Sequence, residues 1–331
     1  MTAPRRRTVL WSLPVLLVLS VLACPAASAA DSSGPMLPGL PATSGGGGGR
    51  GRAAVLSLPT LLAGGANPVL GMLDDHGVGP VEAVVSRDDR YVFVSDEYSP
   101  AVSVFDLAKA LTGGFDAPGV AVGKILLGQA TVGLTLSPDG RRLYATSEAA
   151  NPDATREVAN LSDTQHGTLT AIDIDTAEQH PAASVLAQVA AGCRPVRVAL
   201  SADGSVAWVT ARGSDALLAF DTTQMLVRPQ DALRAVVPVG AQPVGLLLTS
   251  NGRYALTANS ARFTDPQGPQ TVSVVDTVTA LAGGPALVGT IPAGAFPRQF
   301  DDDPATGQVV LTNFGSHTVE AFPSPRRPLQ R

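Results

Sequence analysis

A short segment that repeats five times constrains the fold of this chain more than any other feature. Its copies read "PVEAVVSRDDRYVFVSDEYSPAVSVFD", "TVGLTLSPDGRRLYATSE", "PVRVALSADGSVAWVTARGSDALLAFD", "PVGLLLTSNGRYALTANS" and "PRQFDDDPATGQVVLTNFGSHTVEAF". The anchor serines Ser86, Ser137, Ser201 and Ser250 lie 51, 64 and 49 residues apart. A period near 50 residues is the length of one four-stranded propeller blade. The sequence therefore predicts an all-β fold, a β-propeller of four-stranded blades with five recognisable repeats; six or seven blades remain compatible with it.

The residues within each repeat agree with this prediction. An apolar strand is followed by a turn such as "SPDG" at 137–140, where proline presets φ and glycine tolerates a positive φ. The second strand carries an aromatic or aliphatic residue two positions before its Thr or Ser, and we expect this column to pack between blades rather than to stack on a ligand. Its members are Phe93, Tyr144, Trp208, Ala255 and Val310.

The two ends of the repeat region predict how the ring closes. Residues 55–77 resemble residues 274–294, so the chain enters the fold with the third and fourth strands of a blade. It leaves the fold near Phe322, after a third strand. We therefore expect a strand near Val69–Leu73 to complete the C-terminal blade and close the ring, which leaves no open sheet edge. A surplus strand near Ala54–Leu58 has no place in this five-blade count, and a sixth, degenerate blade is an alternative. The predicted propeller spans residues 53–323, and 324–331 form a polar tail.

The N-terminal region predicts export. Arg5 to Arg7 precede an apolar run from Val9 to Ala23, and small residues follow at Ala27–Ala29, which is typical of a signal peptide over residues 1–30. The run is too short and too interrupted by proline for a membrane span. A Sec signal is the preferred interpretation; a twin-arginine signal and a lipid anchor at Cys24 are the alternatives. Residues 31–52, with five consecutive glycines, read as a flexible linker. The predicted location is secreted or extracytoplasmic.

Composition excludes some classes of partner. The full chain has a net charge of −5, and removal of residues 1–30 with their three arginines makes it about −8. An acidic surface repels phosphate backbones, so we expect no nucleic-acid partner. Cys193 is the only cysteine outside the predicted signal peptide, so no intramolecular disulfide is expected. Stability must then come from the hydrophobic core.

The segments "YALTANS" and "VVLTNFGSHTVEAF", with the Ser-Pro-Asp-Gly turns and the ending "VSVVD", resemble the YVTN family of β-propeller repeats. The resemblance covers residues 54–323. It implies a propeller related to secreted and surface-layer proteins and to propeller-type lactonases. The chain departs from common family members because it has five clear units where seven are usual. The family resemblance specifies the fold better than it specifies an activity.

Propeller geometry predicts the functional face. Loops between the second and third strands share one face with the entries to the first strands, and the insertions 149–167 and 261–270 both fall there. We call this side the insertion face. Loops on a rigid scaffold commonly carry binding residues, and planar arginine side chains suit carboxylate or phosphate groups. The candidate ligand-binding residues at this rim are His76, Glu97, Glu148, Arg194, Arg212, Gln242, Asn259, Arg298 and Asn313.

Motifs for catalysis are not recognised in the sequence. It has no Cys-x-x-Cys-His, no His-Glu-x-x-His and no Gly-x-Ser-x-Gly. The acidic runs at 74–75 and 301–303 are interpreted as ordinary turn residues rather than as a calcium site. The preferred hypothesis is therefore an exported, non-catalytic binding scaffold without cofactor or metal, whose partner is a protein, a polymer or a small polar or anionic molecule. The alternative is a lactonase-like hydrolase that acts on a small ring ester at the central tunnel mouth.

Overall fold

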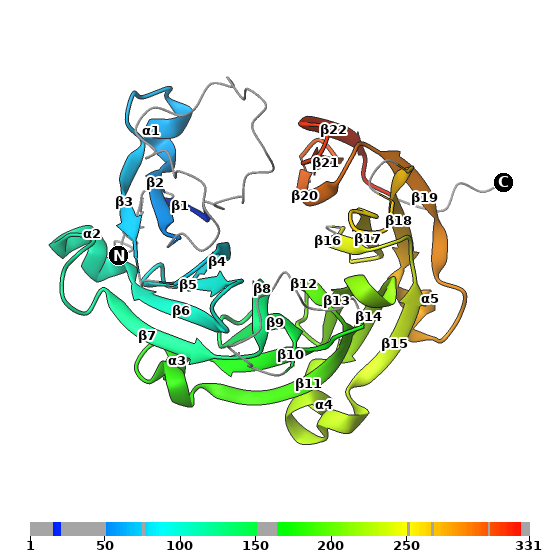
Figure 1. Cartoon of the computed structure of the whole chain (residues 1–331), viewed down its shortest axis with the longest axis horizontal. Helices are drawn as coiled ribbons and strands as arrows, with labels where there is room; N and C mark the ends of the chain where they lie inside the picture. The colour runs from blue at the N-terminus through cyan, green and yellow to red at the C-terminus, as the bar shows by residue number, and fades with distance from the viewer. Residues whose placement is uncertain are drawn as a thin grey trace, which may run out of the picture.

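The computed structural model describes residues 16–20 (backbone only), 51–74, 77–150, 164–249, 252–265, 268–303 and 305–325. These residues form six antiparallel sheets, four with four strands and two with three strands. Figure 1 shows the sheets following one another around a centre, which is consistent with a propeller-like fold. The predicted all-β class is thus confirmed. The part of the chain that is described contains no helix long and apolar enough to span a membrane.

Five of the sheets correspond to the five sequence repeats. Their first, innermost strands are β4 (Pro80–Val85), β8 (Gln129–Leu136), β12 (Pro195–Leu200), β16 (Pro243–Leu248) and β20 (Pro297–Asp303). The second strands are β5 (Tyr91–Asp96), β9 (Arg142–Ala149), β13 (Val206–Ala211), β17 (Tyr254–Asn259) and β21 (Gln308–Asn313). The third strands are β6 (Ala101–Asp106), β10 (His166–Asp173), β14 (Ala216–Asp221), β18 (Gln270–Asp276) and β22 (Thr318–Pro323). The outer strands are β7 (Ala121–Leu126), β11 (Val185–Cys193), β15 (Leu233–Pro238) and β19 (Leu287–Ala293).

Short helices connect the last two strands of every sheet except β20–β22. They are α1 (Leu58–Leu62), α2 (Leu107–Gly113), α3 (Ile174–Ala177), α4 (Thr222–Val227) and α5 (Thr277–Leu281). The aspartate that ends each third strand of the four-stranded sheets caps the helix that follows; Asp106, for example, accepts a hydrogen bond from the Lys109 N–H at 2.8 Å. Such a cap satisfies an N–H that the helix itself leaves without a partner. The 3₁₀ turns η2 (Pro181–Ala183), η3 (Arg212–Ser214) and η4 (Pro229–Asp231) complete the regular elements.

The anchor serine fixes the turn between the first and second strands. The Ser137 hydroxyl donates to Asp139 Oδ1 and accepts from the Arg142 N–H at 2.9 Å, so it ties both sides of the turn together. Ser201 makes the same pair of contacts, to Asp203 and from the Val206 N–H. Side-chain bonds to nearby backbone are the reason that Ser and Asp favour turns.

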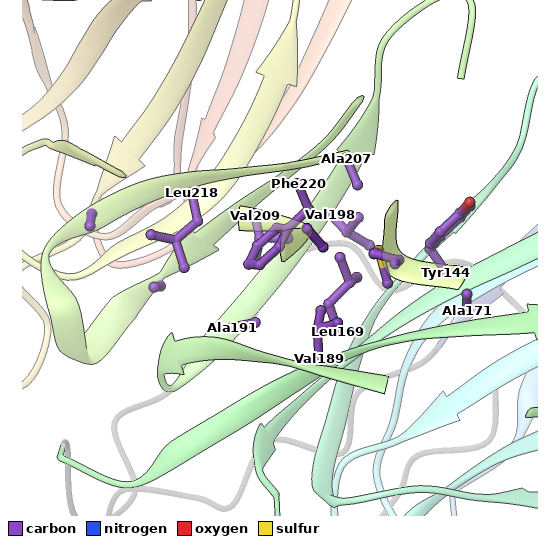
Figure 2. Packing of buried hydrophobic residues seen from close by; sticks show 14 residues of the cluster. Tyr144, Leu169, Ala171, Val189, Ala191, Val198, Ala207, Val209, Leu218 and Phe220 are labelled. Atoms are coloured by element: carbon purple, nitrogen blue, oxygen red, sulfur yellow. The ribbon is translucent and has the colours of Figure 1, made fainter. Parts of the chain in front are cut away.

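The core lies between neighbouring sheets. Tyr144 and Trp208 are 1% and 2% exposed, and each packs in a cluster that joins its own sheet to the next one. Figure 2 shows the cluster in which Tyr144 and Leu169 of one sheet meet Val209 and Phe220 of the neighbouring sheet. The prediction that the aromatic or aliphatic column of the second strands packs between blades is confirmed for Tyr144 and Trp208. Because such clusters link adjacent sheets, the inner strands are held in a fixed order around the centre.

The prediction of ring closure was wrong in its pairing. Strand β3 (Val69–Leu73) pairs with β2 (Ala53–Ser57), and within the described ranges no ladder joins it to β22. The surplus strand near Ala54–Leu58 is β2, so the two segments form a sixth sheet. Strand β1 (Leu16–Ser20), inside the predicted signal peptide, pairs with the other edge of β2. Residues 21–50 and 326–331, which include most of the predicted linker and tail, lie outside the description.

Candidate functional site

A pocket of about 150 Å³ opens at the centre, where the five inner strands begin. Each of the five repeat sheets contributes side chains to it. The lining residues are Val81, Glu97, Tyr98, Val132, Glu148, Arg194, Val196, Arg197, Arg212, Val244, Arg262, Phe263, Phe296, Arg298 and Phe314. We call this the central pocket. It lies on the insertion face, because Arg262 and Phe263 belong to the 261–270 insertion.

The repeat positions these side chains by the same backbone geometry in each sheet. The residue before each inner strand's first Pro or Thr has a positive φ, as at Arg194 (53°) and Phe296 (51°). The ladder between first and second strands then shifts register at the start of the strand, between Pro195 and Val198 for example. A bulge of this kind re-aims a side chain, and non-glycine residues with positive φ concentrate at functional sites. The residue that follows this Pro or Thr, such as Val196, therefore lines the pocket in each of the five repeat sheets.

One side of the central pocket is a buried cluster of two arginines and one carboxylate. The carboxylate of Glu148 accepts from Arg194 Nη2 at 2.5 Å and from Arg212 Nη2 at 3.3 Å. All three residues are at most 6% exposed. Glu148 thus fixes the planes of two guanidinium groups and offsets part of their charge, as buried charges require.

A second group in the pocket lining consists of arginines and aromatic rings in contact. The Cζ of Arg262 lies 4.7 Å from the centroid of Phe263 and 4.8 Å from that of Phe296. Arg298 lies over Phe296 and Phe314 at 5.8 and 5.6 Å. A cation over the face of an aromatic ring is attracted by the electron density of the ring. These contacts therefore help to order the two arginines.

Two buried glutamines hold the backbone of the aromatic side. Gln242 Oε1 accepts from the Phe263 N–H at 2.7 Å, and Gln270 Oε1 accepts from the Phe296 N–H at 2.6 Å. Both glutamines are buried. Because each amide oxygen binds the backbone of a stacking phenylalanine, the glutamines position the rings that order Arg262.

The deep end of the central pocket combines an apolar ring with one ion pair. Val132 and Val196 are 3% and 8% exposed and, with Val81 and Val244, line the pocket from four neighbouring inner strands. Arg197 Nε lies 3.9 Å from Glu82 Oε2, which also accepts from the Leu134 N–H at 2.8 Å. The floor is therefore mainly made of valine side chains.

Glu97 is the second carboxylate that lines the central pocket. Its pKa is raised above the usual value, first because burial disfavours the charged form and second because the Glu148 carboxylate repels it. The guanidinium groups of Arg298, Arg262 and Arg194 act in the opposite direction. Perturbed carboxyl groups of this kind concentrate at functional sites.

The structure brings five of the nine predicted site residues together at the central pocket, namely Glu97, Glu148, Arg194, Arg212 and Arg298. Gln242 does not line the pocket itself but binds the backbone of Phe263, which does. Asn259 and Asn313 are 2% and 1% exposed, and their amides donate to the third strand of the same sheet, to Thr271 and Ser273 and to Thr318. His76 and most of loop 149–167 lie outside the described residues.

Sequence reasoning missed six of the polar and aromatic lining residues: Tyr98, Arg197, Arg262, Phe263, Phe296 and Phe314. Two of them had a signal in the repeat. Phe296 precedes Pro297 as Arg194 precedes Pro195. Phe314 occupies the same position in its repeat as Glu97. The Phe314 N–H donates to the Phe296 carbonyl at 2.8 Å, and the Glu97 N–H donates to the Gly79 carbonyl at 2.8 Å; Phe296 and Gly79 are the residues with positive φ before their inner strands.

Among the described residues, no group of three or more His, Cys, Asp or Glu side chains could hold a metal ion. The polar groups of the central pocket are instead guanidinium N–H donors and two carboxyl groups. This arrangement can bind an oxyanion by charge-assisted hydrogen bonds.

Comparisons with known proteins give a fold relation alone. No family model matches the chain, and no curated protein matches it. A solved structure of a functionally unknown protein from Desulfotomaculum acetoxidans is similar, with a TM-score of 0.54 and 12% identity over 81% of this chain and 74% of that chain. Hydrazine synthase from Kuenenia stuttgartiensis covers 82% of this chain and 89% of its own at 14% identity, and its TM-score of 0.44 supports no inference.

Proposed function

We propose that this chain is an exported, non-catalytic β-propeller of the YVTN type that binds an anionic ligand, or the anionic group of a larger partner, in the central pocket. One observation carries the proposal. Five arginines and two glutamates line the pocket, an excess of three positive charges, in a chain whose net charge is −5. A local reversal of charge in a concave site attracts and concentrates anions.

The arrangement of the arginines supports binding rather than mere solubility. Arg194 and Arg212 are buried and oriented by Glu148, and Arg262 contacts the rings of Phe263 and Phe296. Guanidinium groups that are already ordered lose little further entropy when they bind a carboxylate or phosphate. Phe263 and Phe314, 56% and 45% exposed, extend the site outward and offer contact area to a larger partner.

Calorimetric titration at low ionic strength tests the proposal, with inorganic phosphate, sulfate and acetate as probes. We expect at least one of these anions to bind wild-type protein, and Arg262→Gln to weaken that binding about tenfold because a charge-assisted donor is lost. Arg228→Gln is the matched control, since Arg228 is exposed and does not line the pocket. Absence of binding by all three anions, or equal loss in the control, would overturn the proposal.

Export is tested independently by the mass of the protein recovered from its own culture. We expect the chain to begin after Ala29 or Ala30. A start at a lipid-modified Cys24 would support the lipoprotein alternative, and an intact N-terminus in the cytoplasm would overturn export. The lactonase-like alternative stays a prediction from family resemblance, and assays of ring-ester hydrolysis test it.

A further inference from the structure

The floor of the central pocket is mainly apolar although its walls are charged. Val81, Val132, Val196 and Val244 directly follow the first Pro or Thr of four successive inner strands and line the pocket together. A hydrated inorganic ion that filled this space would place charge against valine methyl groups, and taking charge away from water without compensating hydrogen bonds is costly. The floor therefore matches the alkyl part of a ligand rather than its charged group.

The charged group of the ligand belongs with the ordered arginines. Arg262 lies over the rings of Phe263 and Phe296, and Arg298 lies over those of Phe296 and Phe314. A guanidinium group presents its N–H donors as a planar fork. A planar carboxylate matches this fork with two parallel hydrogen bonds. The wall above the floor is thus suited to a carboxylate.

Size and charge limit the ligand further. The central pocket has a volume of about 150 Å³, which suits a small molecule or one end of a larger molecule. Glu97 and Glu148 also line the pocket, so a second negative charge on the ligand would meet a carboxyl group. These limits favour a single carboxylate with a short alkyl chain.

We infer that the central pocket takes a small amphipathic monocarboxylate, or the monocarboxylate end of a larger molecule, with its alkyl part on the valine floor and its carboxylate at Arg262 and Arg298. The inference rests on the proposed function and deepens it, because anion binding alone does not require an apolar floor. Each methylene buried on the floor is expected to raise affinity about fourfold.

The test compares acetate, butyrate, isovalerate and inorganic phosphate by calorimetric titration of the full-length protein. We expect isovalerate to bind at least tenfold more tightly than acetate. Val244→Thr, which keeps the β-branched shape and adds a hydroxyl to the floor, should weaken isovalerate about fivefold and change phosphate or acetate less than twofold. Val236→Thr on the exposed face of β15 is the matched control.

The outcomes separate the two proposals. Equal affinity for acetate, phosphate and isovalerate, or no effect of Val244→Thr on isovalerate, would overturn the amphipathic ligand and leave anion binding standing. Absence of binding by all four probes would overturn both. Binding of isovalerate that Val244→Thr and Val236→Thr weaken equally would also overturn the inference, because the floor would then have no specific role.

Discussion

Replacement of Glu148 by glutamine separates the stability of the central pocket from its binding. The carboxylate is 6% exposed and accepts from two arginines that are 6% and 4% exposed, at 2.5 and 3.3 Å. The amide of Glu148→Gln keeps the shape of the side chain and one acceptor oxygen. It removes the negative charge that both guanidinium groups face.

The expected loss of stability follows from this burial. Removal of one member of a buried ion pair costs about 3–5 kcal/mol, because the remaining charge stays in a poorly solvated place. The retained amide oxygen and the contact of Arg212 with the Phe263 ring at 4.6 Å keep the loss at the low end, about 3 kcal/mol. For a domain of this size that corresponds to a fall in Tm of roughly 6 °C.

Urea unfolding followed by circular dichroism measures the change in the free energy of unfolding. Asp231→Asn is the control, since the Arg228–Asp231 pair is exposed and such pairs contribute less than about 1 kcal/mol. The same Glu148→Gln variant should bind anions about tenfold more tightly at low salt, because two arginines lose their counter-charge. A stability loss no larger than that of the control, or weaker anion binding, would refute this account of the cluster.

Three further changes test other parts of the structure. The pKa of Glu178 is raised to about 7 by burial and by the charges of Asp88 and Asp175, so the native state holds a proton that the unfolded state releases. The free energy of unfolding of the wild-type protein should therefore fall as the pH rises from about 4.5 to 7. In Glu178→Gln the urea midpoint should vary less with pH across that range. Trp208→Ala should lower the free energy of unfolding by about 3–5 kcal/mol in the same assay, because the indole fills an inter-sheet cluster. Gln242→Leu removes the acceptor for the Phe263 N–H and should weaken anion binding several-fold in titrations, with unchanged binding contradicting its positioning role.

Sequence reasoning succeeded where neighbouring residues decide the structure. The Ser137 hydroxyl binds groups two and five positions further along the chain, and Asp106 caps a helix three positions later. Interactions this short recur whenever the residues recur, so the repeat predicted turns, strands and the inter-sheet core together. The same alignment of the repeats placed the candidate residues Glu97 and Arg212 on the insertion face.

Sequence reasoning failed where two segments far apart in the chain could both pair with the same strand, β3. Strands β2 and β3 are joined by a short helical link, so their pairing closes a small loop at low entropic cost. Pairing of β3 with β22 would join opposite ends of the repeat region, and no local pattern distinguishes the two. Asn313 is the last residue of β21, and Phe314, the first residue of the turn that follows, is the one that lines the central pocket.

The left-handed residue before each inner strand explains how one repeat can carry a specific site. Gly79, Ala130, Arg194, Gln242 and Phe296 all have positive φ between 51° and 71°. Glycine and alanine at this position add no functional group, whereas the other three bind Glu148, hold the Phe263 backbone and stack on Arg262. The backbone geometry is therefore a property of the repeat, and the chemistry of the central pocket is a property of the side chains placed on it. Substitution at this one column can then change the chemistry of the pocket without any change in how the sheets pair.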